Sequence, residues 1–301
     1  MRLSAKIVAF LNFKGGVGKT ASVVNIGACL AKYHSKKVLI VDLDAQSNSS
    51  SWLMQPPELR KHTQSLEKTV YQLFNDQILG TRLFQLSTAL ILGVPRNREG
   101  FPLIGSLDLL PSVVQMIDIE MRMRQVQGSA GYTALYRSLI PIMNNYDYIL
   151  LDCPPNLHAV TQNALIAAQY CVVPFIPDAL SLSGFEFLVD RVNVLWRQQS
   201  AQFTARPKPQ FAAFIINHYE QRKNVFAAGV NELEIALNQI RPSGKIHPKA
   251  VCLKPFVRFN VHVAESTSEH LPVVLHKENS IGAEDYISLT QNFIHHFETV
   301  L

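Results

Sequence analysis

The sequence predicts an α/β fold, with a doubly wound, mostly parallel twisted sheet flanked by helices on both faces. Three observations lead to this prediction. Apolar, β-branched runs recur along the chain, helical periods of apolar residues fall between them, and a glycine-rich segment follows the first run. Continuous apolar runs are typical of parallel strands that are buried on both faces. Strands that alternate with helices imply right-handed crossovers, and these place helices on both sides of one sheet.

Six apolar runs are the expected strands: Ile7–Leu11, Lys37–Val41, Tyr148–Leu151, Cys171–Phe175, Phe211–Ile216 and Val251–Phe256. Helices are expected between them where apolar residues recur at i, i+3 and i+7, as at Val23, Ile26 and Leu30. The segment Trp52–Pro111 is the least regular, because prolines interrupt its short apolar pieces. We therefore expect one domain over residues 1–301, with an irregular excursion from the sheet edge at about 52–111.

Composition excludes several classes of protein. With 48% hydrophobic and 17% charged residues, the 301-residue chain can form a sizeable core and is not disordered as a whole. No apolar stretch reaches the roughly 20 residues that a helix needs to cross a bilayer. The four cysteines form no CxxC pair, which argues against a disulfide framework, a zinc knuckle or an iron–sulfur site. A reducing, cytoplasmic setting is expected.

Positive charge is concentrated in one part of the chain. Residues 191–258 contain eleven Lys and Arg against three acidic residues, a net charge of +8, whereas the remaining chain has 17 basic and 20 acidic residues. A basic block on a mildly acidic protein is typical of a surface that binds polyanions. A solvated surface with scattered lysines is the equally open alternative.

The most informative segment is residues 12–20, NFKGGVGKT, which follows the first strand and opens a helix. This is the context of a phosphate-binding loop. Its glycines can adopt φ > 0, so that backbone N–H groups close around phosphate oxygens, and the helix N-terminus faces the same anion. Lys19 would neutralise charge on the phosphates, and the Thr20 hydroxyl would coordinate Mg²⁺. The predicted nucleotide-binding residues of this loop are Lys14, Gly15, Gly16, Val17, Gly18, Lys19, Thr20 and Ala21.

Two of the expected strands end in carboxylates. Residues 38–46, VLIVDLDAQ, place Asp42 and Asp44 two positions apart and hence on the same side of the strand. Residues 148–155, YILLDCPP, reach Asp152 at the end of the second strand. Strand-terminal Asp residues also serve as helix caps. Beside a phosphate-binding loop, we expect Asp44 and Asp152 to be functional.

The loop differs from the ordinary GxxxxGK[ST] pattern, because Phe13 replaces its first glycine and Lys14 precedes the glycine pair. This variant resembles the deviant Walker A motif of the ParA/MinD family of ATPases. The resemblance implies a P-loop NTPase fold of the SIMIBI type, ATP and Mg²⁺ as cofactors, and a homodimer that forms on ATP binding. It also implies that Lys14 reaches the nucleotide of the partner, an arginine-finger role worth roughly 10³–10⁵ in rate.

The same resemblance implies roles for the carboxylates. Asp44 would position the attacking water, Asp42 would support the site, and Asp152 would hold Mg²⁺. The implied catalytic residues are Lys14, Lys19 and Asp44, and the implied metal site comprises Thr20, Asp152 and Asp42. Asn217 matches an Asn that contacts adenine in relatives, so it joins the nucleotide-binding residues.

Two features qualify the resemblance. Ala45 replaces the usual proline of the DxDPQ segment, and His262 falls near where relatives carry an arginine implicated in DNA binding. Lys14 lies so near the first residue that we expect the small, Soj-like type, without a preceding helix-turn-helix domain.

The output surface separates functions within this family. MinD-like members bind membranes through a basic terminal helix, but the last helix here has no Lys or Arg, and its apolar stripe is expected to dock on the body of the protein. Partition-type members bind DNA non-specifically as ATP-bound dimers. The candidate DNA-binding residues are Arg191, Arg197, Arg222, Lys223, Lys254 and Arg258.

The resulting expectation is a slow ATPase that binds DNA non-specifically, partitions or positions DNA or a large cargo, and is stimulated by a ParB-like partner carrying a basic peptide. Such a protein would be cytoplasmic and nucleoid-associated. Two alternatives stay open: a MinD-like, membrane-associated positioning ATPase and a metabolic P-loop enzyme. An electron-transfer relative of the nitrogenase iron protein is disfavoured, because paired cluster cysteines are lacking.

Overall fold

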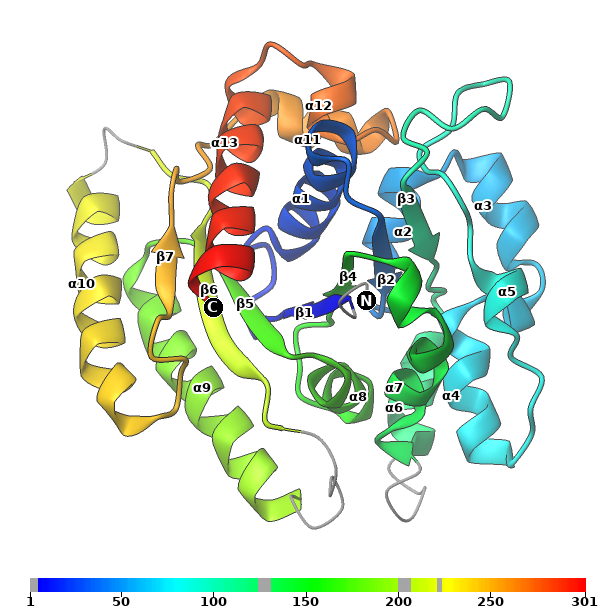
Figure 1. The fold of residues 1–301 in the computed structure, drawn as a ribbon, viewed down its shortest axis with the longest axis horizontal. Helices are drawn as coiled ribbons and strands as arrows, with labels where there is room; N and C mark the ends of the chain where they lie inside the picture. The colour runs from blue at the N-terminus through cyan, green and yellow to red at the C-terminus, as the bar shows by residue number, and fades with distance from the viewer. Residues whose placement is uncertain (1–4, 124–130, 200–206, 221–223) are drawn as a thin grey trace.

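The computed structural model describes residues 5–123, 131–199, 207–220 and 224–301. They form one seven-stranded sheet in which every pair of neighbours is parallel, in the order β3-β2-β4-β1-β5-β6-β7 (Figure 1). The strands are β1 (Lys6–Phe10), β2 (Val38–Asp42), β3 (Leu107–Leu110), β4 (Tyr148–Asp152), β5 (Tyr170–Phe175), β6 (Gln210–Ile216) and β7 (Val251–Leu253). The predicted fold class is confirmed.

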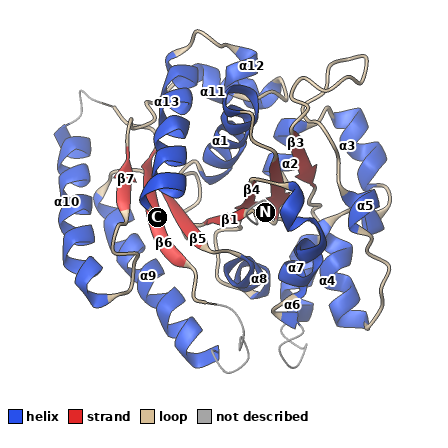
Figure 2. Cartoon of the chain, viewed as in Figure 1, coloured by secondary structure: helices blue, strands red, loops and turns tan. Residues whose placement is uncertain are grey.

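Helices cover both faces of this sheet (Figure 2). One layer contains α1 (Lys19–His34), α2 (Asn48–Leu53), α11 (Val261–Ser268), α12 (Val273–His276) and α13 (Ile281–His295). The other contains α4 (Val70–Leu79), α6 (Met116–Met123), α7 (Ala134–Leu139), α8 (Ala159–Ala167), α9 (Ala179–Gln199) and α10 (Asn224–Ile240). The remaining helical pieces are α3 (Pro56–Thr63), α5 (Leu86–Ala89), η1 (Leu66–Lys68), η3 (Ile140–Asn145), η5 (Arg241–Ser243) and η6 (His296–Val300).

The strands read as continuous apolar runs because both of their faces are buried. In β4, Tyr148 and Leu150 pack into the layer of α1 and α13, while Ile149 and Leu151 pack into the opposite layer. Successive side chains of a strand point to opposite faces, so two helical layers require apolar residues at every position.

The order of the strands determines where a ligand site can form. β1 lies between β4 and β5, so the crossover connections lead away from it in both directions. In such open sheets, ligands bind beyond the carboxyl ends of the strands at the point where the order reverses. Asp42 at the end of β2 is the register partner of Asp152 at the end of β4, which itself pairs with Phe10 at the end of β1. The predicted carboxylates therefore meet beside the predicted phosphate-binding loop.

Two elements differ from expectation. The segment 52–111 holds more regular structure than its prolines suggested: it contains α3, α4, α5 and the edge strand β3. Strand β7 ends at Leu253 and does not continue to Phe256. The reason is Pro255, which has no N–H group to donate to a sheet ladder.

The last helix lies against the body, as predicted. Tyr286, Leu289 and Phe293 of α13 are fully buried, and α13 packs on α1. Among the residues that the structure describes, no helix has both the length and the apolar character needed to cross a membrane.

Candidate nucleotide-binding site

The loop between β1 and α1 has the backbone conformation of an anion cradle. Gly16 and Gly18 adopt left-handed φ angles of 75° and 82°, which side-chain-bearing residues rarely take. At Gly18, a Cβ atom would also lie 2.6 Å from Nδ2 of Asn217. The predicted use of positive φ is confirmed at these two glycines but not at Gly15, and Gly18 has a steric reason as well.

Lys19 is the first residue of α1 and is almost completely buried. Burial lowers the pKa of its ammonium group, while the charges of Asp152 and Asp44 act in the opposite direction. Its Nζ atom lies 3.5 Å from the carbonyl oxygen of Lys14, within the loop. A positive charge is thus held between the glycine-rich loop and the carboxylates, where phosphate charge has to be neutralised.

Asp152 is tied to hydroxyl groups on one side only. Its Oδ2 atom accepts hydrogen bonds from Thr20 Oγ1 at 2.9 Å and from Ser49 Oγ at 2.7 Å. Its Oδ1 atom is buried and has no hydrogen-bond partner among the described residues. A buried carboxylate oxygen without a partner is costly. It is therefore the atom at which an added cation would be stabilised most.

Asp42 lies beside Asp152 and is also fully buried. The backbone N–H and the hydroxyl of Ser50 donate to its Oδ2 atom at 2.9 and 2.7 Å. Burial raises the pKa of both carboxyl groups, and the charge of Asp152 raises that of Asp42 further. Ionising both carboxyl groups is thus unfavourable here, and a divalent cation would make it favourable.

The donors at this point are all oxygen atoms, from Thr20, Asp152 and Asp42. Hard oxygen ligands with few protein contacts are the set that Mg²⁺ prefers, because it keeps several of its own waters. The residues present therefore fit Mg²⁺, and the unpartnered Oδ1 atom of Asp152 is the observation that carries this fit.

Ser49 and Ser50 were not singled out by the sequence analysis. Both lie in α2, directly after the loop that follows β2, and both are fully buried. The only sequence signal was the run of serines at residues 49–51, which begins five residues beyond Asp44 and also fits an ordinary polar turn. Their side chains orient the two buried carboxylates.

Asp44 differs from the other two carboxylates because it is only partly buried. Its backbone N–H donates to Asp42 Oδ1 at 3.2 Å, and its Oδ1 atom accepts from the N–H of Gln46 at 3.0 Å. The structure thus brings Asp44 to the mouth of the site, where solvent can reach it. A residue that orients a water molecule needs this position.

Lys14 lies at the exposed rim of the loop. Its Nζ atom is 2.7 Å from Oδ2 of Asp178, between β5 and α9. The neighbouring Phe13 packs its ring on Phe187 of α9 with 5.7 Å between centroids, yet Phe187 remains 57% exposed. The guanidinium of Arg191 lies over the other end of this apolar patch, 5.8 Å from the Phe187 ring. A cation and exposed aromatic surface thus adjoin the phosphate cradle.

A cavity of about 260 Å³ adjoins the N-terminus of α1. Its walls are mostly apolar and include Ala21, Val257, Phe259 and Val263. Asn217 also lines it: Nδ2 donates to the carbonyl of Val17 at 2.9 Å, while Oδ1 is buried without a described partner. Asn217 therefore braces the loop with one end of its amide and offers an acceptor with the other.

The candidate DNA-binding residues do not form one cluster. Arg191 and Arg197 lie on α9, in one helical layer. Arg258 is bound to Asp285 of α13 in the opposite layer, with its Nη2 atom 2.6 Å from Oδ1. Lys254 follows β7 at the sheet edge. Arg222 and Lys223 lie outside the described residues.

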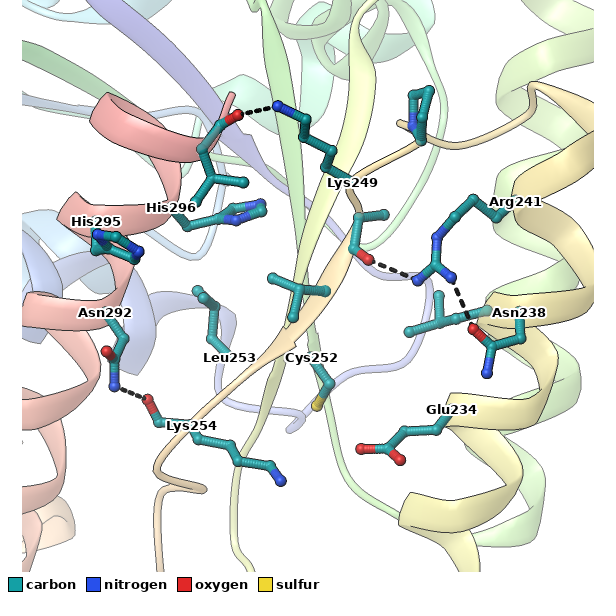
Figure 3. Close-up of a pocket in the computed structure, with 15 residues that line it drawn as sticks. Glu234, Asn238, Arg241, Lys249, Cys252, Leu253, Lys254, Asn292, His295 and His296 are labelled. Carbon is teal, nitrogen blue, oxygen red and sulfur yellow. Dashed lines mark hydrogen bonds between the residues drawn. The ribbon is translucent and has the colours of Figure 1, made fainter.

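Lys254 borders a groove of about 660 Å³ at this edge, between α10 and α13 (Figure 3). Arg241 donates to the carbonyl of Ala250 just before β7, and Asn292 donates to the carbonyl of Lys254 just after it. Side-chain donors thus bind backbone carbonyl groups on either side of β7, which helps to protect an exposed edge strand from pairing with another strand. Lys249 and Lys254 together make the margin of this groove basic.

The fold and this geometry define a P-loop nucleotide-binding protein. A family model described as an AAA domain matches residues 5–205. The sporulation initiation inhibitor protein Soj of Bacillus subtilis is 29% identical over 286 residues, which are 95% of this chain and 97% of Soj. The chromosome partitioning protein ParA of Myxococcus xanthus is 25% identical, over 94% of this chain and 86% of that protein.

Solved structures agree on the fold. A Mycobacterium smegmatis protein described as cobyrinic acid a,c-diamide synthase, with an ATP analog and magnesium bound, gives a TM-score of 0.71 at 23% identity over 99% of this chain and 97% of that chain. The cell division ATPase MinD of Pyrococcus furiosus gives 0.63 at 19% identity, over 96% and 98%. The chain belongs to this AAA-domain family and is a P-loop ATPase of the ParA/MinD type.

Proposed function

We propose that the chain is a Soj-like ParA ATPase. It binds ATP with Mg²⁺, dimerises around the nucleotide and, as the ATP-bound dimer, binds DNA without sequence preference. The observation that carries the proposal is the loop 12–20, in which Lys14 precedes the glycines while Lys19, Thr20 and Asp152 converge behind them. Similarity to Soj and ParA over nearly the whole chain supports it.

The phosphates of ATP occupy the cradle of Gly15, Gly16 and Gly18, with Lys19 beside them. Thr20 and Asp152, supported by Asp42, would hold Mg²⁺, which supplies positive charge next to the transferred phosphoryl group. Asp44 orients the water that attacks. The base lies in the apolar cavity beside Ala21, where the buried Oδ1 atom of Asn217 accepts a hydrogen bond from an exocyclic amine.

The dimer is supported by the rim of the loop. Exposed Phe187, packed on Phe13, presents apolar surface around Lys14, and a second copy of the chain would cover it. Lys14 exchanges its ion pair with Asp178 for the phosphates held by the partner subunit. A desolvated ion pair with a triphosphate is far stronger than a half-exposed pair with a carboxylate, so ATP favours the exchange.

DNA binding is supported by the basic part of the chain. Arg191, Arg197 and Lys254 lie near its surface, and dimerisation doubles their number on one assembly. Contacts to backbone phosphates add up without a single specific pocket. Hydrolysis, stimulated by a ParB-like protein with a basic peptide, separates the dimer and releases DNA. The protein is therefore cytoplasmic, and it is nucleoid-associated while it holds ATP.

Fluorescence anisotropy with a duplex of arbitrary sequence tests this proposal. Binding is expected with ATP and Mg²⁺ but not with ADP, and log K should fall with log salt by about 0.9 per phosphate contact. The variant Asp44→Ala should retain ATP and accumulate on DNA. Binding that ignores salt or needs no ATP would contradict the proposal.

Two outcomes would favour other functions of the same fold. Sedimentation with anionic vesicles would indicate a MinD-like, membrane-associated ATPase, although α13 carries no Lys or Arg. Rapid turnover with a small-molecule substrate, without DNA or partner, would indicate a metabolic enzyme.

A further inference from the structure

Two histidines and one glutamate gather on the helical layer next to the base cavity. His262 and Glu265 are three positions apart on α11, so both lie on one face of that helix. His276 is the last residue of α12, which packs on α11. One ligand atom of each lies within 4.8 Å of the other two, and no motif of the phosphate site includes them.

The distances suit a single small ion. Oε2 of Glu265 accepts a hydrogen bond from Nδ1 of His262 at 2.8 Å and lies 3.7 Å from Nε2 of His276. Four tetrahedral ligands with bonds of about 2.1 Å stand about 3.4 Å apart. The two observed separations lie on either side of this value, so small side-chain rotations bring all three atoms into place.

The backbone under the cluster is fixed. In α12, the N–H of Val273 donates to Oδ1 of Asn25 at 2.8 Å, and both valines of this helix are buried. In α11, the side chain of Asn260 caps the helix by accepting from the N–H of His262 at 2.9 Å. The helices are thus held in place, while Glu265 is about half exposed and open to an incoming ion.

We propose that His262, Glu265 and His276 form a surface site for a borderline divalent transition metal such as Zn²⁺, completed by water. Two imidazoles and one carboxylate are typical of this metal class, whereas the all-oxygen set beside Thr20 suits Mg²⁺. On binding, Nδ1 of His262 gives up the proton that it shares with Glu265 and Nε2 carries the ring proton instead, so that a neutral imidazole presents its Nδ1 lone pair to the metal. The bound ion joins α11 to α12.

The ionisation of Glu265 favours this site. The hydrogen bond from His262 lowers the pKa of its carboxyl group, and the nearby His276 acts in the same direction. The carboxylate is therefore charged and ready to bind a cation. Since α11 also lines the base cavity through Val263 and Ala264, a metal that fixes α11 against α12 would stiffen one wall of that cavity.

The test uses the full chain, freed of metal with a chelator and kept without nucleotide. Isothermal titration with ZnCl₂ should show one strong equivalent, and CoCl₂ should give the intense visible absorption of tetrahedral Co²⁺. His262→Ala and His276→Ala should each weaken binding by at least about tenfold, the loss expected from removing even a supporting partner. The exposed His295→Ala, on α13, is the matched control and should leave affinity unchanged.

Zn²⁺ should also raise the melting temperature of the wild-type protein but not of the variant lacking both histidines. Glu265→Gln keeps the shape of the side chain but removes its charge, and it replaces an alanine variant in this test if that variant fails to fold. It should also bind Zn²⁺ more weakly than the wild type. The double variant retains the phosphate site, so metal that it still binds belongs elsewhere. Equal affinity in the wild type and the double variant would overturn the site, and it would leave the proposed ATPase function untouched.

Discussion

The nucleotide site and the basic surface of this chain are built in opposite ways. In the site, side chains from elements far apart in the sequence converge on one buried point, where the hydroxyls of Thr20 and Ser49 both donate to Asp152. The basic candidates lie on different helical layers and at the sheet edge, and Arg258 is paired with Asp285. A reaction at a phosphoryl group needs side chains placed within hydrogen-bond distance of it. Electrostatic attraction to the phosphates of a DNA backbone, in contrast, adds up over charges that lie far apart. Convergence is therefore evidence for the first function and is not required for the second.

The largest effect on ATP binding should follow from Lys19→Ala. This change removes the buried ammonium group of the cradle, and a lost hydrogen bond to a charged partner costs about 2–3 kcal/mol, or roughly a 30–150-fold weaker Kd for ATP. Titration with a fluorescent ATP analogue measures this loss. The exposed Lys277→Ala should bind normally, and equal affinity of the two variants would mean that Lys19 does not face the phosphates.

Arg258→Ala should act on stability more than on DNA binding. The guanidinium of Arg258 makes a close ion pair with Asp285, which is nearly buried. The substitution therefore leaves the negative charge of Asp285 buried without a neighbouring cation. Because the arginine side chain is itself 44% exposed, we expect the free energy of unfolding to fall by about 1–3 kcal/mol, less than for a fully buried ion pair. Urea unfolding measures the change. Arg197→Ala, at an exposed position of α9, should change the free energy of unfolding by no more than about 0.5 kcal/mol. Similar losses for both variants would contradict the distinction between structural and surface arginines.

The buried carboxylates should make stability depend on pH. Burial raises the pKa of Asp42 above its unfolded value, so the folded state binds more protons, and stability from this group falls as pH rises above about 4. Asp42→Asn removes this decline. Between pH 5 and 8, the variant should therefore gain stability relative to the wild type by up to about 1.4 kcal/mol per pH unit.

Melting curves of the two proteins without Mg²⁺ measure that difference. Comparing the pair cancels the contribution of the histidines. Burial lowers the pKa of His218 and of His296, so their contribution to the pH dependence of stability has the opposite sign. Mg²⁺ and ATP should remove most of the decline, because they compensate the charge. Parallel pH profiles of the two proteins would show that burial does not raise the pKa of Asp42.

The smallest effect concerns the basic surface. Arg191→Ala and Arg197→Ala should each reduce the salt slope of DNA binding by about 0.9 if the side chain meets a phosphate. The matched control is Lys61→Ala on α3, outside the basic part of the chain. An unchanged slope in both arginine variants would move the DNA surface to the groove margin with Lys254.

The sequence predicts the fold class and the phosphate loop because each depends on local patterns. It does not reveal β3, since Asp108 interrupts a four-residue strand. That carboxylate is buried, and it accepts from Tyr146 and Lys37, partners far along the chain. Ser49 and Ser50 are missed for a related reason: hydroxyls acquire a role only from the carboxylates that the fold places beside them.

The same limit applies to pairings between elements. The ion pair of Lys14 with Asp178 joins residues 164 positions apart, and His276 reaches Glu265 only because α12 packs on α11. Such contacts follow from helix packing and not from spacing. A motif identifies which side chain is reactive, and the packing determines what it meets.

The central claim is that ATP makes a dimer through Lys14. Light scattering coupled to size-exclusion chromatography tests it with Asp44→Ala, which should hold ATP without hydrolysing it. With ATP and Mg²⁺, this variant should elute at twice the 33.8 kDa of one chain, and the additional change Lys14→Ala should return it to the single-chain mass. A mass that stays at one chain in Asp44→Ala, or a dimer that persists without Lys14, would contradict the account.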